Sequence, residues 1–289
     1  MEIEVASNSG LCYGVKRALN LALKTRRAVP GDVVVLGDLI HNPGVIARLK
    51  EQGIGRAATP SDVRSATVII RSHGISPEVR RRLDGRKISV VDATCPIVKK
   101  IQKLVAELAG KGLEVVIVGN RDHPETAGLL GHSRGRGLVV ETVAEAARLP
   151  FRRRRAVLAQ STQDLELFEK AAAALVGSTK ELQVYNTICD STLTRQRSTL
   201  DLARRVDVMF VVGGRTSSNT AKLYEMCRRV RPRTYFIESA ADIRPAMLKG
   251  AKKIGISGGA STPPEAIKEA ADAIHASFSR NSHSGSKSS

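Results

Sequence analysis

Three short β-rich runs in this chain each lead into a cysteine that opens a basic, amphipathic stretch. Cys12 lies in NSGLCYGVKRALN, Cys95 in VVDATCPIVKKIQK and Cys189 in VYNTICDSTLTRQR. The contexts recur about a third of the sequence apart, which indicates a threefold repeat. Three equivalent loops that each supply one thiol favour a single site with three protein ligands. Such a site leaves a bound metal one open position.

The repeat extends to two further polar loops in each third of the chain. VVVLGD leads to His41, VVIVGN leads to His123 and Glu125, and VMFVVGG leads to Ser217, Ser218 and Asn219. A third run leads to His73 in the first segment, to Ser161 and Thr162 in the second, and to Ser261 in the third. Short Val- and Ile-rich runs that alternate with helical patterns are typical of buried parallel strands with crossover helices.

The chain therefore reads as three consecutive α/β segments, 1–94, 95–188 and 189–280, followed by a polar tail, 281–289, that we expect to be disordered. Loops at the carboxyl ends of parallel strands face the ligand crevice in such folds. Three small sheets around a pseudo-threefold axis, in a cloverleaf arrangement, would bring the polar loops together at the centre.

Composition narrows the class of protein. A hydrophobic fraction of 42% is ordinary for a globular chain of 289 residues, and no apolar run approaches the length of a membrane span. The N-terminal residues MEIEVASNSG resemble neither a signal peptide nor a transit peptide, so we expect a cytoplasmic protein without membrane attachment. Four widely spaced cysteines in a reducing compartment indicate metal or redox use instead of a disulfide framework.

The net charge of +18 has several interpretations: nucleic-acid binding, a solvated basic surface, or attraction of an anionic small substrate. The basic runs Arg80–Arg82 and Arg152–Arg155 contain no interleaved aromatic residues that would stack on bases. Nucleic acid is therefore the least favoured partner.

Each of the three repeated cysteines lies just before a helical pattern, where exposed backbone N–H groups favour the thiolate that binds metals. Three thiolates suit an iron–sulfur cluster or zinc. The competing interpretation is burial of three small apolar side chains, but their common place in the repeat argues against it. Cys227 breaks the pattern, because it occupies an apolar position within the helical pattern KLYEMCRRV, and we expect it to pack in the core.

The histidines and hydroxyl residues of the loops form a set of hydrogen-bond donors that suits a phosphate or diphosphate. His132, His275 and His283 lie outside the repeated loops. No phosphate-binding GxxxxGK[ST] motif occurs, so a standard nucleotide site is not expected. Glu125 is either a proton-transferring acid or a helix-start residue. Ser161 and Thr162 either donate to a substrate or cap the following helix, and Asp92 and Asp190 suit capping.

Together these motifs resemble those of the 4-hydroxy-3-methylbut-2-enyl diphosphate reductase family. Its members catalyse the last step of the methylerythritol phosphate route to isoprenoids. The matching motifs are GLCYGVKRA, IHNP, SHG, DATCPIV, HPE, NTICDSTLTRQ, VGGRTSSNT and GASTP, from Gly10 to about Pro263. Single motifs such as SHG are weak, whereas DATCP with SSN and three cysteines in order is highly specific.

The resemblance implies a cloverleaf of three α/β domains around a 4Fe–4S cluster with one open iron. It implies that Cys12, Cys95 and Cys189 hold the cluster and that ferredoxin or flavodoxin supplies two electrons. The substrate would lose its hydroxyl group as water and give isopentenyl and dimethylallyl diphosphate. The residues that match the family's diphosphate-holding positions are His41, His73, His123, Ser217, Ser218, Asn219 and Ser261, while Glu125 matches its proton-delivering carboxyl group.

The chain departs from the family pattern at two places. Ser161 stands where the family usually has Thr, so the hydroxyl remains but its orientation is less fixed. Arg215-Thr216 replaces a common Lys-Asn pair, and the net positive charge is higher than expected. From the residues alone, a three-cysteine zinc hydrolase and a basic nucleic-acid-binding module remain as rival functions.

Overall fold

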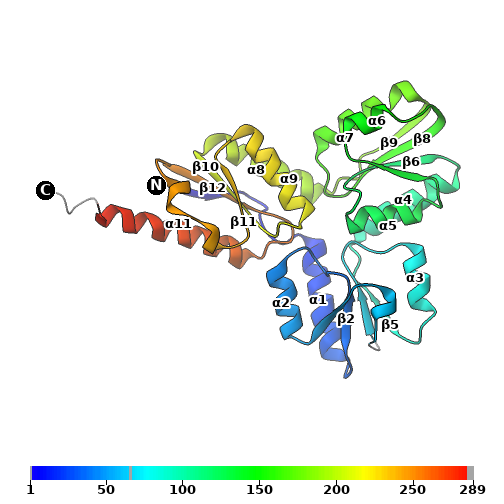
Figure 1. Ribbon diagram of the computed structural model, residues 1–289, viewed down its shortest axis with the longest axis horizontal. Coiled ribbons are helices and arrows are strands. Elements are labelled where there is room, and N and C mark those ends of the chain that lie inside the picture. Colours follow the sequence, from blue (N-terminus) through cyan, green and yellow to red (C-terminus); the bar gives the residue numbers. More distant parts are fainter. Residues whose placement is uncertain (1, 65–66, 285–289) are drawn as a thin grey trace. The chain divides into compact units, whose positions relative to one another are not determined.

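The computed structural model of the chain describes residues 2–64 and 67–284, in which helices alternate with short parallel strands (Figure 1). The strands form three sheets of four strands each. Every strand pairing in these residues is parallel. This confirms the α/β class that the alternation of Val- and Ile-rich runs with amphipathic stretches predicts.

The first two sheets have the same strand order. Sheet I runs β3 (Ile54–Ala57), β2 (Val33–Leu36), β4 (Thr67–Ile70) and β5 (Ser89–Asp92). Sheet II runs β7 (Gly137–Val140), β6 (Glu114–Val118), β8 (Arg152–Ala159) and β9 (Thr179–Tyr185). In both sheets the two central strands contain apolar runs, VVVL and VII in sheet I and VVIV and AVLA in sheet II, and the last strand in the order is followed within four residues by a cysteine.

Sheet III has the same arrangement of strands, but the strand at the end of the order comes from the start of the chain. It runs β11 (Thr234–Ile237), β10 (Val208–Val212), β12 (Lys253–Gly258) and β1 (Glu2–Val5). Strand β1 pairs with β12 from Glu2 opposite Lys253 to Val5 opposite Ile256. The expected first segment, 1–94, therefore supplies sheet I and also the closing strand of sheet III.

Helices connect the strands, and the chain divides into two compact units. Residues Tyr13–Asp190 form the unit with sheets I and II, and Met1–Cys12 together with the chain from Ser191 form the unit with sheet III. The helices are α1 (Tyr13–Ala28), α2 (Pro43–Glu51), α3 (Pro77–Asp84), α4 (Pro96–Gly110), α5 (Pro124–His132), α6 (Val143–Ala147), α7 (Leu165–Ala174), α8 (Asp190–Arg205), α9 (Ser218–Val230), α10 (Pro245–Leu248) and α11 (Pro264–Ser284), with short 3₁₀ turns at Pro60–Asp62, Val176–Ser178 and Ala240–Asp242.

Each sheet buries its central strands between helices. In sheet II, Val115 and Ile117 pack with Leu158 of β8 and with Val105 and Leu108 of α4. Sheet III has an apolar cluster on each face: Phe210 and Ile256 belong to one and Met209 and Val211 to the other, because neighbouring strand residues point to opposite faces. Among the described residues, no helix has both the length and the apolar character needed to cross a membrane.

Two features differ from the sequence-based expectations. Each sheet contains an edge strand that the sequence pattern did not predict, namely β3, β7 or β11, because four residues carry too weak an alternation signal. Helix α11 continues to Ser284, four residues into the expected tail, because no Gly or Pro lies between Asn281 and Ser284 to end it. Residues 285–289, the rest of the expected tail, lie outside the described residues.

The basic run Arg152–Arg155 begins β8 and includes a fully buried arginine. Arg155 is 0% exposed, and its Nε atom lies 2.6 Å from Oε2 of Glu114. Its other donors bond the Pro150 carbonyl, the Ser178 carbonyl and hydroxyl, and the Thr179 hydroxyl. Arg155 therefore ties together the amino ends of β6, β8 and β9, so part of the basic run is structural.

We predict that Glu114→Gln lowers the free energy of unfolding by roughly 3–5 kcal/mol, because it leaves a buried guanidinium without its counter-charge. Glu181→Gln is the matched control. Glu181 pairs with Arg154 at 3.0 Å on the exposed surface, so its loss should cost about 1 kcal/mol or less. Urea unfolding of the two variants measures the difference, and equal losses would contradict the structural role of Arg155.

Candidate active site

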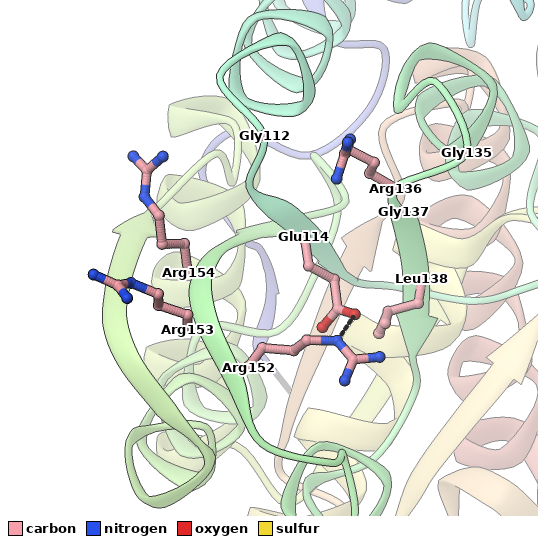
Figure 2. Close-up of a pocket in the computed structure, with 9 residues that line it drawn as sticks. All are labelled: Gly112, Glu114, Gly135, Arg136, Gly137, Leu138, Arg152, Arg153 and Arg154. Atoms are coloured by element: carbon pink, nitrogen blue, oxygen red, sulfur yellow. Dashed lines mark hydrogen bonds and ion pairs between the residues drawn. The ribbon is translucent and has the colours of Figure 1, made fainter.

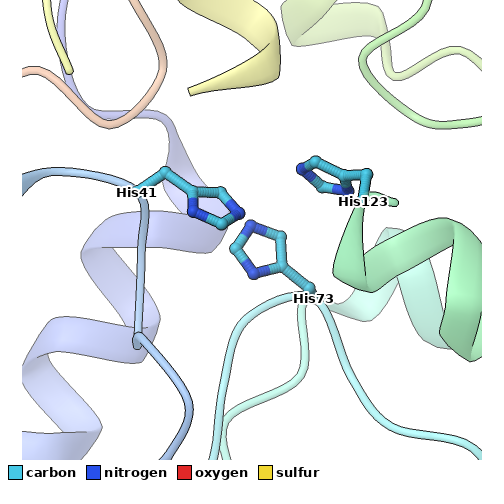
Figure 3. Close-up of side chains that lie close together, drawn as sticks. All are labelled: His41, His73 and His123. Atoms are coloured by element: carbon cyan, nitrogen blue, oxygen red, sulfur yellow. The ribbon is translucent and has the colours of Figure 1, made fainter. Parts of the chain in front are cut away.

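Three histidines converge at the carboxyl edges of sheets I and II. His41 precedes α2, His73 follows β4, and His123 is the N-cap residue of α5. Figure 3 shows the three rings turned toward one another. The ring centroids are 4.5 Å apart for His41 and His73, and 5.1 Å apart for each of the other two pairs. The strand-end loops of the first two segments thus do meet within one unit.

The tautomer of His123 decides what this cluster offers to a ligand. Nδ1 of His123 accepts a hydrogen bond from the backbone N–H of Glu125 at 3.1 Å. In the neutral ring the proton must then lie on Nε2, which becomes a donor. One ring nitrogen of each histidine lies within 4.8 Å of the others, a spacing that also invites a metal. A metal-bound histidine, however, usually donates a hydrogen bond through its second ring nitrogen, whereas Nδ1 of His123 accepts one from Glu125. This contact therefore favours an anion over a metal as the ligand.

Burial favours the neutral form of two of the three histidines. Burial lowers the pKa of His73 well below its ordinary value, and His41, His123 and Arg71 push it further in the same direction. Burial also lowers the pKa of His41, an effect that Asp38 opposes and Arg71 reinforces. Nδ1 of His73 is buried and has no hydrogen-bond partner among the described residues. His41 and His73 therefore favour neutral rings that can bind a ligand through polar nitrogens.

Glu125 and Ser161 form a buried pair between α5 and the loop after β8. The backbone N–H of Ser161 donates to Oε1 of Glu125 at 2.6 Å, and the Ser161 hydroxyl donates to Oε2 at 2.7 Å. Glu125 is 2% exposed and Ser161 is 7% exposed. Glu125 also lies in the first turn of α5, so both interpretations of this residue apply: it suits the helix start and it touches a hydroxyl group in the site.

The capping alternative for Ser161 and Thr162 is wrong. Helix α7 begins at Leu165, and its N-cap is Asp164, whose side chain accepts from the backbone N–H of Glu166 at 2.9 Å. An aspartate cap fits the first turn better than a hydroxyl two or three residues earlier. The Ser161 hydroxyl is therefore directed to Glu125 instead of the helix end.

Gln160 is a site-supporting residue that sequence reasoning missed. It is 0% exposed, and its amide oxygen accepts from the backbone N–H of Asn120 at 3.0 Å. The hydroxyl of Thr126 donates to the same oxygen at 3.4 Å, and the Gln160 amide group donates to Thr162 at 3.1 Å. Gln160 thus fixes the β8 loop against the start of α5. The sequence signal that could have indicated this role is an uncharged amide side chain at the end of a buried strand.

In the other unit, the loops after β10 and β12 bring together a second polar group. Ser217 is the N-cap of α9, Ser218 is its first residue, and Asn219 follows. The hydroxyl of Ser261 donates to that of Ser217 at 3.3 Å, and both residues are buried. Asn219 is 4% exposed, and its amide oxygen and nitrogen have no partner among the described residues. Such a pair of buried, unsatisfied atoms indicates a ligand-binding position.

Each repeated cysteine lies directly before the first residue of a helix: Cys12 before α1, Cys95 before α4 and Cys189 before α8. Each backbone N–H donates to the loop after a neighbouring strand, Cys12 to Ala260 at 3.0 Å, Cys95 to Ser72 at 2.9 Å and Cys189 to Ser161 at 2.9 Å. All three residues are partly exposed. The strand–cysteine–helix repeat of the sequence is therefore present in all three places.

Cys227 differs from these three. It is 0% exposed, it packs with Leu202, Met209 and Leu223, and burial raises the pKa of its thiol to about 12. The expected core role of Cys227 is confirmed. Among the other histidines, His132 is partly buried and contacts the Ile75 carbonyl at 3.3 Å, and His275 is exposed on α11. The side chain of His283 lies outside the described residues.

A basic pocket lies at the opposite edge of sheet II from the histidines. Its volume is about 430 Å³, and Arg136, Arg152, Arg153 and Arg154 line it beside Glu114, at the amino ends of β6, β7 and β8. In Figure 2, Arg152 points toward Glu114, whereas Arg153 and Arg154 project from the other side of their strand. The arginine run thus contributes its charge away from the histidine cluster.

Comparisons with known proteins agree with this geometry. The model of the LytB protein family matches residues 3–275. A Geobacter metallireducens protein called 4-hydroxy-3-methylbut-2-enyl diphosphate reductase is 40% identical over 274 residues, which cover 95% of this chain and 97% of the relative. A protein of the same name from Aquifex aeolicus is 41% identical over 272 residues, which cover 93% of this chain and 94% of the relative.

Two solved structures are also similar. One, described as (E)-4-hydroxy-3-methyl-but-2-enyl diphosphate reductase, the terminal enzyme of the non-mevalonate pathway, has 40% identity and a TM-score of 0.68. It covers 96% of this chain and 100% of its own. The E-1-hydroxy-2-methyl-but-2-enyl-4-diphosphate reductase from Plasmodium falciparum has 24% identity and a TM-score of 0.88, with 94% and 87% covered. The second likeness concerns the fold alone.

Buried neutral histidines predict a pH-dependent stability. Because the pKa of His73 is lowered in the folded state, the unfolded chain binds more protons once the pH falls below about 6.5. The free energy of unfolding of the metal-free protein should therefore fall between pH 7.5 and 5.5, by at most about 1.4 kcal/mol per pH unit for one histidine.

In urea unfolding, His73→Asn should flatten this slope. Ser76→Ala removes the cap of α3, where the Ser76 hydroxyl accepts from Val79, and serves as a non-titrating control. It should lower stability by about 1 kcal/mol at every pH and keep the wild-type slope. An unchanged slope in His73→Asn would show that this ring does not titrate as described.

Proposed function

The chain belongs to the LytB protein family, and we propose that it works as a 4-hydroxy-3-methylbut-2-enyl diphosphate reductase. The substrate is an allylic alcohol that carries a diphosphate. Two electrons and two protons would convert it to isopentenyl or dimethylallyl diphosphate and water. One proton leaves with the hydroxyl group as water, and the other is added to carbon. This would be the terminal step of the non-mevalonate route, as in the similar solved enzyme.

The observation that carries the proposal is the set of buried polar atoms that lack a partner among the described residues. Among them are Nδ1 of His73 and both amide atoms of Asn219. Leaving such atoms unsatisfied costs about 1–3 kcal/mol each, and a bound oxygen-rich group would offset this cost at the donor atoms. Diphosphate oxygens accept hydrogen bonds and therefore suit the Nε2–H group of His123 and the Asn219 amide nitrogen.

The residues proposed to bind the diphosphate share uncharged or weakly basic donor groups. They are His41, His73, His123, Ser217, Ser218, Asn219 and Ser261. Neutral imidazoles and hydroxyl groups bind a phosphate through directed hydrogen bonds. The strength of these bonds depends more on geometry than the attraction of a single ammonium charge does. The starts of α5 and α9 add backbone N–H groups with a favourable dipole.

We propose that Cys12, Cys95 and Cys189 hold a 4Fe–4S cluster with one open iron. The donor set fits: each residue is a partly exposed cysteine outside any disulfide and lies directly before the first residue of a helix. When bound, the cluster would supply electrons and a Lewis-acidic iron for the departing hydroxyl group. Three soft ligands also suit zinc, so a zinc hydrolase is the rival that metal analysis must exclude.

Glu125 and Ser161 would deliver a proton. The Ser161 hydroxyl bonds Oε2 of Glu125 at 2.7 Å, so a proton on the carboxyl group can pass through the hydroxyl to a leaving oxygen. The Ser161 N–H holds the other carboxyl oxygen and fixes its orientation. Gln160 keeps the loop in place against α5. Burial of all three residues excludes bulk water from this path.

The electron donor and the compartment are also proposals. A ferredoxin or flavodoxin would bring the two electrons, and an acidic surface on such a protein would associate faster with a chain of net charge +18. We place the reaction in the cytoplasm, because free thiols and a thiolate-bound cluster belong to a reducing compartment.

Iron analysis after anaerobic purification tests the cluster. We predict a brown protein with about four iron atoms and four sulfides per chain, and loss of most of this iron in Cys95→Ser. Cys227→Ala is the matched control and should keep its iron, because that thiol packs in the core. Colourless protein with a single zinc would instead support the hydrolase, and metal-free protein with salt-dependent retention on DNA would support the nucleic-acid module.

Turnover and binding measurements test the proton path. Glu125→Gln should bind the substrate with a similar Kd and lower kcat by about 10²- to 10⁴-fold, because the amide cannot supply the proton. Ser161→Ala should also slow turnover, whereas Ser161→Thr keeps the hydroxyl group and should retain it. Wild-type turnover in Glu125→Gln would contradict the proton-delivering role and leave Glu125 with only its role at the start of α5.

A further inference from the structure

A buried threonine in the first turn of α9 contacts the serine that caps the same helix. The Thr220 hydroxyl donates to Oγ of Ser217 at 3.0 Å, and the Thr220 backbone N–H donates to the same oxygen at 3.4 Å. The hydroxyl of Ser261 is a third donor to this oxygen, at 3.3 Å. Thr220 is 0% exposed and Ser217 is 4% exposed. One buried serine oxygen therefore accepts hydrogen bonds from three neighbouring groups.

These contacts determine where the Ser217 hydroxyl can direct its own hydrogen. A hydroxyl group has two acceptor lone pairs and one hydrogen to donate. Donors already occupy the acceptor side of Ser217, and none of the hydrogen bonds described above uses its hydrogen. The neighbouring Asn219 also lacks partners, because neither atom of its buried side-chain amide is bonded within the described residues. Two donors in the first turn of α9 are thus left for an acceptor outside the chain.

Two glycines give the Thr220 side chain its place. A Cβ atom on Gly259, which follows β12, would overlap the Thr220 hydroxyl. A Cβ atom on Gly213, which follows β10, would lie 2.8 Å from the same oxygen, and Gly213 also has a φ of 151° that other residues rarely adopt. The loops after β10 and β12 therefore pack directly on Thr220 and leave its hydroxyl little room to turn away from Ser217.

Helix capping explains only part of this arrangement. An N-cap serine needs to accept from one backbone N–H of the first turn, and the N–H of Thr220 supplies that bond. A valine at position 220 would preserve it and would fill a similar volume. A buried hydroxyl has to be hydrogen-bonded to be tolerated, so its presence here calls for a further role.

We propose that Thr220 is a positioning residue for the diphosphate, which holds the Ser217 hydroxyl as a hydrogen-bond donor to the anion. This rests on the proposed function, which supplies the ligand. Thr220 itself does not have to touch the substrate. Because Ser217 accepts from Thr220, it cannot donate to Thr220, and its hydrogen is directed elsewhere before a ligand arrives. A donor oriented in advance loses less rotational freedom on binding, which strengthens the complex.

Calorimetric titration of the full-length protein with inorganic pyrophosphate, and with the substrate, tests the role in binding. Thr220→Val keeps the shape and removes the hydroxyl group, and it should raise Kd about three- to tenfold. Thr220→Ser keeps the hydroxyl group and should bind within about twofold of the wild type. A wild-type Kd in Thr220→Val would overturn the proposal. Should that variant not fold, Thr220→Ala takes its place with the same expectation.

Thr199→Val is the matched control. Thr199 is also 0% exposed and belongs to the same unit, but its hydroxyl lies 2.8 Å from that of Ser257 and not at Ser217. Its loss should lower stability in urea unfolding and leave Kd unchanged. An equal rise of Kd in Thr199→Val and Thr220→Val would show a general effect of removing a buried hydroxyl group, and would refute a specific role of Thr220.

A double-mutant cycle decides whether Thr220 acts through Ser217. Ser217→Ala should raise the Kd of pyrophosphate by at least as much as Thr220→Val does. In the Ser217→Ala background, Thr220→Val should then have no further effect, because the hydroxyl group that it positions is already gone. Losses that simply multiply would show that Thr220 acts independently of Ser217, and would overturn the proposal.

Steady-state turnover of the iron-loaded protein separates this role from the proposed function itself. Thr220→Val should raise KM and change kcat by less than about twofold, because the proposed proton path uses Glu125 and Ser161 instead. Normal wild-type turnover together with an unchanged KM in Thr220→Val would overturn the role of Thr220 alone. A wild type that neither binds nor converts the substrate would refute the proposed function, and the role of Thr220 with it.

Discussion

Each repeated cysteine is placed by one backbone hydrogen bond between two loops at the carboxyl edge of a parallel sheet. Strands β1, β5 and β9 each lie at an edge of their sheet and lead into a loop with a cysteine, whose N–H donates to the loop after the neighbouring strand, β12, β4 or β8. A change of register in any of these pairings would move the cysteine loop away from its acceptor. The repeat therefore conserves a backbone device, while the side chains in the loops that accept the bond differ: His73, Ser161 and Ser261.

This division explains how a strongly basic chain could bind the proposed diphosphate through neutral groups. Burial lowers the pKa of His41 and His73, which favours directed hydrogen bonds over a diffuse field. The arginine run of β8 lies at the far edge of its sheet, where Arg155 is used in packing and the others line a basic pocket. In the proposed function, net charge would account for long-range attraction of acidic partners, and the loops would account for specific contacts.

The strand-end loops were predictable because their polar residues follow continuous apolar runs at nearly constant spacing. His41, His73 and His123 meet as the parallel topology requires. The edge strands β3, β7 and β11 were not predictable, since four residues at a sheet edge carry little pattern. The choice between a ligand-binding and a capping role for Ser161 was open, because it depends on where α7 starts, and the structure excludes the cap since Asp164 takes that position. The role of Gln160 depends on Asn120 and Thr126, two partners distant in sequence that no local motif reveals.

The closing strand of sheet III constrains when the cysteine set becomes complete. Strand β1 pairs with β12, and the N–H of Cys12 bonds Ala260, so these two partners do not exist until about nine-tenths of the chain has been made. Cys95 and Cys189 have theirs earlier, because Ser72 and Ser161 precede them in the sequence. Contacts between the two ends of a chain close the longest loop and carry the largest closure entropy. The proposed three-thiol site would therefore be completed last at Cys12, after synthesis has passed β12.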